Sequence, residues 1–313
     1  ILRACFPCAS ITGAPKASTM RLIRELEDTP RGVYTGAIGY WAPGRRAQFN
    51  VAIRTAVVDG LRRRARYGVG SGIVWDSSAE DEYHECLLKG RILTEPIASF
   101  ELIETLRWSP GEGYWLEAFH FERLKESAAR FGFRFDEAAC RSALNEAVEG
   151  VARPQRVRLT LDRFGRAQVT LADAPPVARE LAEFARAPVR VRVAGSPVST
   201  NDLWLYHKTT CREVYERALS SARAVGPCDD VMLWNEQGEA TETTIGNLVV
   251  ARGGRMLTPP VSAGLLAGTF RRWLLERGVV EEGVLTVDSL RAADGLWRVN
   301  GVRGWERIEL VDF

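Results

Sequence analysis

The chain has 313 residues, enough for two domains that each bury a core of their own. Hydrophobic residues make up 46% and charged residues 26%, and the formal net charge of +2 gives no reason to expect binding to nucleic acid or to a membrane surface. No apolar stretch is long enough to span a membrane, and there is no signal-peptide pattern. Six cysteines without disulfide-framework spacing indicate a reducing compartment, so we expect a cytoplasmic protein.

The first block of the chain alternates helix-like and strand-like segments. Apolar residues at helical spacing predict a helix over 15–26, with Pro15 as an early helical residue. Runs rich in β-branched and aromatic residues predict strands over 36–40, 49–54 and 67–74. A closing helix is expected over 80–93, and the two blocks join near Leu93–Pro96.

The second block contains more strands than helices. A strand over 100–106 forms a predicted hairpin with 114–116, and a helix follows over 120–131 with Leu124 and Ala128 on one face. Paired strands are expected over 156–161 and 168–171, and further strands over 189–193, 231–234 and 248–251. A helix is expected after Lys208 to about Ala222, and another over 269–277. These patterns predict an α/β (α+β) protein with one domain over 1–95 and a second over 96–313.

Three separated motifs of the second block supply the parts of a pyridoxal phosphate site. Lys208 offers an amine for a Schiff base, and Glu242 offers a carboxylate that keeps a pyridine nitrogen protonated. Gly268 and Thr269 open a helix whose first backbone N–H groups can take a phosphate. The motifs span residues 206–215, 241–247 and 264–271.

In their order and in their residues, these motifs resemble the class IV (fold type IV) pyridoxal-phosphate enzymes. The resemblance is strongest to the 4-amino-4-deoxychorismate lyases of this class. The run 119–128 resembles the H-x-x-R-L-x-x-S-A signature of that family, which implies that Arg123 holds the cofactor phosphate. The resemblance implies a two-subdomain fold and a homodimer. It also implies that Lys208 is the Schiff-base lysine and the general base, and that Asn247 braces the loop around Glu242.

The segment 297–305 resembles the end of lyases that are fused to a synthase. Asn300 is then expected to contact cofactor or substrate, and Arg303 a substrate carboxylate. A structural Arg303 paired with an acidic neighbour is an equally good reading. His207 is interpreted as a packing or hydrogen-bonding histidine rather than a proton shuttle.

The first block resembles the C-terminal part of chorismate-binding enzymes. Among these, its sequence most resembles component I of aminodeoxychorismate synthase. The resemblance rests on the runs 6–16, 31–40, 49–55, 68–74 and 76–89. It implies that Glu85 is a Mg²⁺ ligand with Glu82 beside it, and that Arg54 and Lys89 contact substrate. Spacing alone would make Glu82, Glu85 and Lys89 a surface ion-pair set, and the surrounding motifs favour the metal site.

The chain starts at Ile1 and runs directly into a motif, so we expect a fragment of a longer synthase–lyase fusion. The larger part of the chorismate-binding domain would supply a further metal-binding Glu, and without it we expect no synthase activity from residues 1–95. A glutamine amidotransferase is the partner that this block would bind.

The function that these motifs favour is release of 4-aminobenzoate and pyruvate from 4-amino-4-deoxychorismate, in the folate pathway. A class IV aminotransferase acting on branched-chain or D-amino acids would use the same Lys208, Glu242 and Arg123, because the fold type determines the cofactor and not the reaction. A third reading is an inactive scaffolding remnant, which intact cofactor residues argue against.

Overall fold

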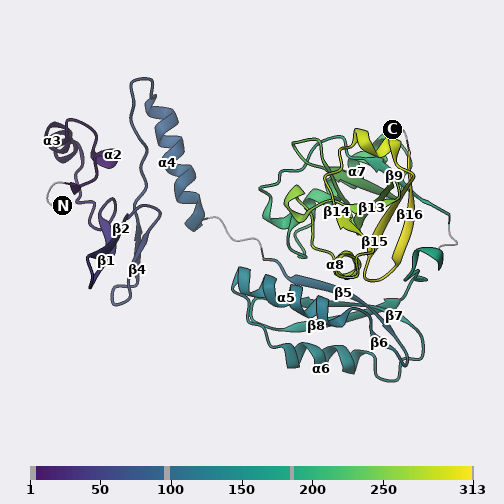
Figure 1. Cartoon of the computed structure of the whole chain (residues 1–313). Coiled ribbons are helices and arrows are strands. Elements are labelled where there is room, and N and C mark those ends of the chain that lie inside the picture. Colours follow the sequence, from purple (N-terminus) through teal and green to yellow (C-terminus); the bar gives the residue numbers. More distant parts are fainter. Residues whose placement is uncertain (1–4, 95–98, 184–186, 312–313) are drawn as a thin grey trace. The chain divides into compact units, whose positions relative to one another are not determined.

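The computed structural model describes residues 5–94, 99–183 and 187–311. The chain separates into two compact units, residues 1–99 and residues 100–313, which are described separately (Figure 1). The expected joint near Leu93–Pro96, and with it the expected domain boundary after residue 95, lies largely outside the described residues. No helix in the described ranges combines the length and the apolar character needed to cross a membrane.

The first unit consists of short helices and two separate β-hairpins. Its elements are α2 (Ala9–Thr12), α3 (Lys16–Leu26), β1 (Ala37–Ala42), β2 (Arg46–Val51), β3 (Ala56–Asp59), β4 (Arg64–Tyr67) and α4 (Ala79–Thr94). The strands β1 and β2 pair antiparallel, as do β3 and β4. The helices α3 and α4 confirm the helix predictions, except that Pro15 is the N-cap of α3 with an extended backbone.

The predicted strand over 67–74 is wrong beyond Tyr67, where β4 ends. Gly68, Gly70 and Gly72 follow at alternate positions, and glycine contributes no side chain to hold a strand against its neighbours. The first unit also buries little: Ala52 is the only fully buried side chain among its described residues, whereas Trp75 is 99% exposed. Its apolar surface therefore faces outward.

The second unit begins with a four-stranded antiparallel sheet in the order β6-β5-β7-β8, packed against two helices (Figure 1). The elements are β5 (Leu102–Ser109), β6 (Gly113–Tyr114), α5 (Glu117–Phe131), α6 (Glu137–Ala147), β7 (Gln155–Leu161) and β8 (Ala167–Asp173). Antiparallel pairing of β7 with β8 confirms the prediction for this pair. The predicted hairpin partner of β5 is shorter than expected, because Leu116 adopts a left-handed backbone and caps α5.

Successive side chains of β7 point alternately into the core and toward a cavity. Val157, Leu159 and Leu161 are buried in the core with α5 and α6. Because successive strand residues point to opposite faces, Arg156 and Arg158 lie on the other face of this sheet. That face lines the cavity described below.

An eight-stranded mixed sheet forms the rest of the second unit, in the order β11-β10-β9-β16-β15-β12-β13-β14. Its strands are β9 (Val189–Val193), β10 (Asp230–Trp234), β11 (Ala240–Thr243), β12 (Asn247–Arg252), β13 (Arg255–Thr258), β14 (Glu281–Glu282), β15 (Gly295–Asn300) and β16 (Gly304–Leu310). The helices are α7 (Glu213–Val225) and α8 (Thr269–Glu276), with 3-10 turns η1 (Leu181–Glu183), η2 (Leu203–Leu205), η3 (Val261–Ala263) and η4 (Asp288–Ala292). Glu242 lies within β11, which corrects its expected place in a loop.

We predict that Phe270→Ala lowers the free energy of unfolding by about 3–5 kcal/mol, because a fully buried ring at the start of α8 leaves a cavity. The rings of Trp273 and Trp305 lie 5.5 and 6.1 Å from that of Phe270, so urea unfolding followed by tryptophan fluorescence reports on this site. Phe164→Ala is the control, since that side chain is 64% exposed, and a comparable loss in both variants would contradict the prediction.

Candidate active site

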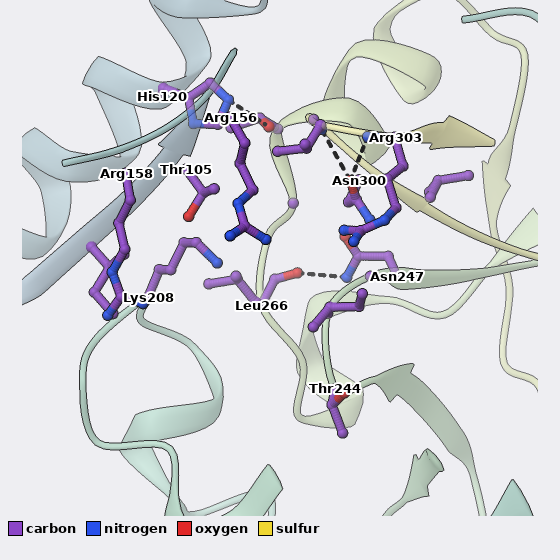
Figure 2. A pocket seen from close by; sticks show the side chains of 18 of the residues that line it. Thr105, His120, Arg156, Arg158, Lys208, Thr244, Asn247, Leu266, Asn300 and Arg303 are labelled. Carbon is purple, nitrogen blue, oxygen red and sulfur yellow. Dashed lines mark hydrogen bonds between the residues drawn. The ribbon is translucent and has the colours of Figure 1, made fainter. Parts of the chain in front are cut away.

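A cavity of about 390 Å³ opens in the second unit, lined by residues from both of its sheets (Figure 2). It brings together every site residue expected in the second block, namely Arg123, Lys208, Glu242, Asn247, Gly268, Thr269, Asn300 and Arg303. These residues span 181 positions of the chain, from 123 to 303 counted inclusively. Such a volume suits a cofactor together with a small substrate.

Hydrogen bonds of Lys208 and Thr210 to the start of the four-stranded sheet hold Lys208 in the cavity wall. Its carbonyl oxygen accepts a 2.8 Å hydrogen bond from the N–H of Ile103 at the start of β5, and Thr210 and Glu101 exchange two further bonds. The side chain points into the cavity (Figure 2). Loss of water around the amine, helped by the nearby positive charge of Arg123, lowers the pKa of Lys208 to about 8. The amine is therefore much closer to its neutral, nucleophilic form at neutral pH than an exposed lysine is.

Glu242 is a buried carboxylate with three hydrogen-bond donors. The hydroxyl of Tyr215 donates to Oε1 at 2.8 Å, the N–H of Leu266 donates to Oε1 at 3.1 Å, and Asn247 Nδ2 donates to Oε2 at 3.1 Å. Burial raises the pKa of Glu242 to about 7, against the opposing effect of the donors. A cation placed against this carboxylate would hold it ionised.

A close approach between Asn247 and Gly268 forms the floor of the cavity. Asn247 opens β12 and also donates to the carbonyl oxygen of Leu266 at 2.8 Å (Figure 2). A Cβ atom at position 268 would lie 1.9 Å from Asn247 Oδ1, so any other residue would displace the Asn247 side chain from its hydrogen bonds. Gly268 is the N-cap of α8, which leaves the first N–H groups of this helix at the cavity.

Arg123 reaches the cavity from α5 and is already paired with a carboxylate. Its Nε and Nη2 donate to the two oxygens of Glu104 at 2.8 and 2.6 Å, and Nη1 donates to the carbonyl oxygen of Ala267 at 3.1 Å. His120 Nδ1 lies 2.6 Å from Glu104, and its Nε2 lies 3.3 Å from the Thr269 hydroxyl. Burial alone would raise the pKa of Glu104, but Arg123 and His120 lower it to about 2.

The two remaining expected residues are Asn300, which ends β15, and Arg303, which lies in the turn before β16. Asn300 Oδ1 accepts from the N–H groups of Val302 and Arg303 at 3.0 and 2.9 Å (Figure 2), while its Nδ2 is buried without a partner among the described residues. Arg303 lines the cavity, and its Nε lies 3.6 Å from Glu306. Arg303 therefore lies where both interpretations place it, in the cavity wall and beside an acidic residue.

Sequence reasoning missed several polar residues that line this cavity, including Arg156, Arg158, Arg212 and Tyr215. It also missed Glu104, which pairs with the lining residue Arg123. Alternation within β7 was the available signal for Arg156 and Arg158, because every second residue of this strand had to leave the core. No local signal distinguished Tyr215, which lies seven residues after Lys208 in a helix that has polar residues on several sides.

The expected magnesium site lies in the first unit, at α4. Glu85 forms a 2.6 Å ion pair with Lys89, which also donates to the carbonyl oxygen of Gly70 at 2.9 Å. Glu82 accepts a hydrogen bond from the Ser77 hydroxyl, and Arg54 is exposed just after β2. Among the described residues no group of three or more His, Cys, Asp and Glu side chains is arranged to hold a metal ion. The described residues therefore do not assemble a magnesium site.

The parts required by pyridoxal phosphate are present in the second unit's cavity. It contains a lysine amine, a buried carboxylate, an arginine beside the start of a helix, and an Asn300 amide nitrogen that has no partner within the described ranges. Lys208 would hold the cofactor covalently and Glu242 would face its ring nitrogen. Arg123 and the N–H groups at the start of α8 would hold the phosphate.

Comparison with known proteins gives the family. A profile described as amino-transferase class IV matches residues 101–311, and a profile described as chorismate binding enzyme matches residues 1–95. The chain therefore belongs to the class IV aminotransferases, a family of pyridoxal-phosphate enzymes, and its first block is similar to chorismate-binding enzymes. Both resemblances seen in the motifs, and the mixed α/β fold class, are confirmed.

Individual relatives match one block or the other. A provisionally assigned aminodeoxychorismate lyase of Schizosaccharomyces pombe is 33% identical over 208 residues, covering 64% of this chain and 86% of that protein. The structure of a provisionally assigned amino-acid aminotransferase from Mesorhizobium loti is 35% identical with a TM-score of 0.62, covering 68% of this chain and all of that one. An aminodeoxychorismate synthase of Streptomyces griseus is 47% identical over 88 residues, and the match spans 28% of this chain and only 12% of the synthase.

We predict that Glu104→Gln removes a stabilisation that depends on pH. Because the pKa of Glu104 falls from 4.5 to about 2 on folding, the carboxylate contributes about 3 kcal/mol above pH 4.5, and this contribution disappears as the pH falls toward 2. The difference between the free energies of unfolding of wild type and Glu104→Gln should thus be largest at pH 7 and fall by more than half at pH 3, where the folded protein is still above the pKa of Glu104. Urea unfolding at both pH values measures this, with the exposed Glu149→Gln as control. A difference that stays constant with pH would refute the prediction.

Proposed function

We propose that the second unit is a pyridoxal-phosphate-dependent 4-amino-4-deoxychorismate lyase, which releases 4-aminobenzoate and pyruvate. The observation that carries this proposal is the charge of the cavity wall. Arg156, Arg158 and Arg303 line the same cavity as Lys208 and Glu242 (Figure 2). The substrate has two carboxylates, one on the ring and one on the enolpyruvyl group, and guanidinium groups bind carboxylates with good geometry. The similarity to the S. pombe lyase supports the same reaction.

The chemistry divides between the cofactor and the chain's own residues. Bound pyridoxal phosphate supplies an electron sink for negative charge on the carbon that bears the substrate amine. Lys208 Nζ removes the proton from that ring carbon, and its pKa of about 8 keeps a useful fraction of the amine neutral. The electrons of the broken C–H bond enter the ring, the neighbouring C–O bond breaks, and the ring becomes aromatic. The departing enolpyruvate takes up a proton and becomes pyruvate.

The other residues bind and orient. We assign Glu242 to the ring nitrogen, with Asn247 bracing its carboxylate, and Arg123, Gly268 and Thr269 to the phosphate. Asn300 offers cofactor or substrate an amide N–H that no described residue occupies, and we assign Arg303 to a substrate carboxylate.

A class IV aminotransferase for branched-chain or D-amino acids is the second candidate. The similarity to the M. loti structure favours it, since that protein is provisionally an amino-acid aminotransferase. An aliphatic amino acid brings one carboxylate to a cavity lined by several guanidinium groups. It would therefore leave Arg156 or Arg158 without a carboxylate from the substrate, whereas a dicarboxylate can engage more than one guanidinium group. The cavity wall thus fits the dicarboxylate better.

The remaining assignments rest on family resemblance. We propose a homodimer, a cytoplasmic location, and domains over 1–95 and 96–313. For the first block we propose a glutamine amidotransferase partner, and we propose that Arg54 and Lys89 contact a chorismate-type substrate. Glu82 and Glu85 would contribute to a Mg²⁺ site only together with further ligands that the described residues do not supply. We also propose that residues 1–95 alone do not turn over chorismate.

We predict that the full chain, loaded with pyridoxal phosphate, releases 4-aminobenzoate and pyruvate in equal amounts from 4-amino-4-deoxychorismate. Lys208→Ala should lower kcat by about 10²- to 10⁴-fold, because the general base is lost. Lys125→Ala, an exposed lysine on α5, is the matched control. Amine transfer to a 2-oxo acid with no pyruvate release would favour the aminotransferase. Failure to bind the cofactor at all would favour the inactive remnant.

A second prediction concerns the carboxylate contacts. Arg158→Met should raise KM for aminodeoxychorismate about 10- to 100-fold, the loss expected for one hydrogen bond to a charged group, while cofactor affinity stays the same. Arg163→Met, an exposed arginine in the β7–β8 turn, should leave KM unchanged. Steady-state kinetics and cofactor titration measure the two quantities. An unchanged KM in Arg158→Met would remove this residue from the substrate site.

A further inference from the structure

The geometry points to Tyr215 as a positioning residue that keeps the Glu242 carboxylate ionised and aimed at the ring nitrogen of the cofactor. This inference rests on the assignment of Glu242 to that nitrogen, and it does not depend on which substrate is used. Tyr215 and Glu242 both line the cavity, and both side chains are buried, with exposed fractions of 6% and 4%. Their contact is direct: the phenol hydroxyl donates to Glu242 Oε1 at 2.8 Å.

An ionised carboxylate only accepts hydrogen bonds, whereas a protonated one must donate at one oxygen. Around Glu242 the hydroxyl of Tyr215, the N–H of Leu266 and the amide of Asn247 account for three donors. The surroundings therefore favour the anion, although burial by itself opposes it. An anionic Glu242 keeps a proton on the ring nitrogen, which is the condition for an effective electron sink.

Tyr215 differs from the other two donors in where it comes from. Leu266 and Asn247 belong to the cavity floor, whereas Tyr215 is on α7, the helix that follows Lys208 in the chain. The guanidinium carbon of Arg212 lies 4.6 Å from the centre of the Tyr215 ring, and Arg212 Nη2 donates to the carbonyl oxygen of Thr244 at 2.5 Å. These contacts tie the Lys208 segment to the β11–β12 turn that follows Glu242. The hydroxyl of Tyr215 thus sets the spacing between the proposed base and the proposed nitrogen partner.

The ring and the hydroxyl of Tyr215 have separable roles. The ring packs in a core cluster with Leu205, Val231 and Leu233, so Tyr215→Phe keeps the packing and removes only the donor. Tyr206→Phe is a matched control from the same chain segment. Its hydroxyl donates to the carbonyl oxygen of Thr200 at 2.7 Å, its ring contacts the same cluster, and it does not line the cavity.

The test uses the full chain loaded with pyridoxal phosphate labelled with ¹⁵N in the ring. In wild type the ¹⁵N chemical shift should be that of a protonated ring nitrogen. In Tyr215→Phe it should move toward the unprotonated value, because the Glu242 carboxylate becomes more basic and retains the proton. The cofactor dissociation constant should rise by up to about tenfold, because Glu242 loses one of the three contacts that orient it toward the ring nitrogen. Glu242→Gln should move the shift in the same direction.

The outcomes separate this inference from the proposed reaction. A wild-type ¹⁵N shift and dissociation constant in Tyr215→Phe, or equal changes in Tyr206→Phe, would overturn the role of Tyr215 whatever the substrate proves to be. A shifted nitrogen in Tyr215→Phe together with no product release by wild type would support Tyr215 and reject the lyase. Absence of bound cofactor in wild type would overturn both proposals.

Discussion

A carboxylate removed from water must be surrounded by donors that are held in place, and Glu242 imposes this constraint on the second unit. Its three donors come from the helix after Lys208, from the segment before α8 and from the first residue of β12. Satisfying all three at once brings these segments together around one point. The close approach of Asn247 to Gly268 follows from the same requirement, because the Asn247 side chain must reach Glu242 and Leu266 together.

A second buried charge organises the opposite wall of the cavity. Glu104 lies on β5 and neutralises Arg123 while holding His120 against Thr269. Arg123 therefore enters the cavity oriented, with part of its donor capacity already used. A phosphate placed there would depend on the N–H groups at the start of α8 as well as on the guanidinium. The cavity is consequently built between two compensated carboxylates, and its remaining wall carries the arginines that favour an anionic substrate.

The first unit contrasts with the second in how much it buries. Nearly all of its described side chains are at least partly exposed, including the large apolar ones of Leu61 and Trp75. Its ion pair between Glu85 and Lys89 satisfies both charges without a metal. A unit of this kind contributes motifs that match chorismate-binding enzymes while contributing little packing energy of its own.

The sequence by itself determined much of the secondary structure of this protein and the types of residue that its proposed cofactor site contains. Apolar residues at helical spacing located α3, α4 and α5, and alternating residues located β7 and β8. The motifs around Lys208 and Glu242 identified the family. Each of these signals is contained in a short stretch of chain. Tertiary structure decided which partners meet. Glu242 joined a strand and residues 68–74 did not. Arg158 and Tyr215 became cavity residues and Glu104 became the partner of Arg123, because pairing and burial depend on segments distant in the chain.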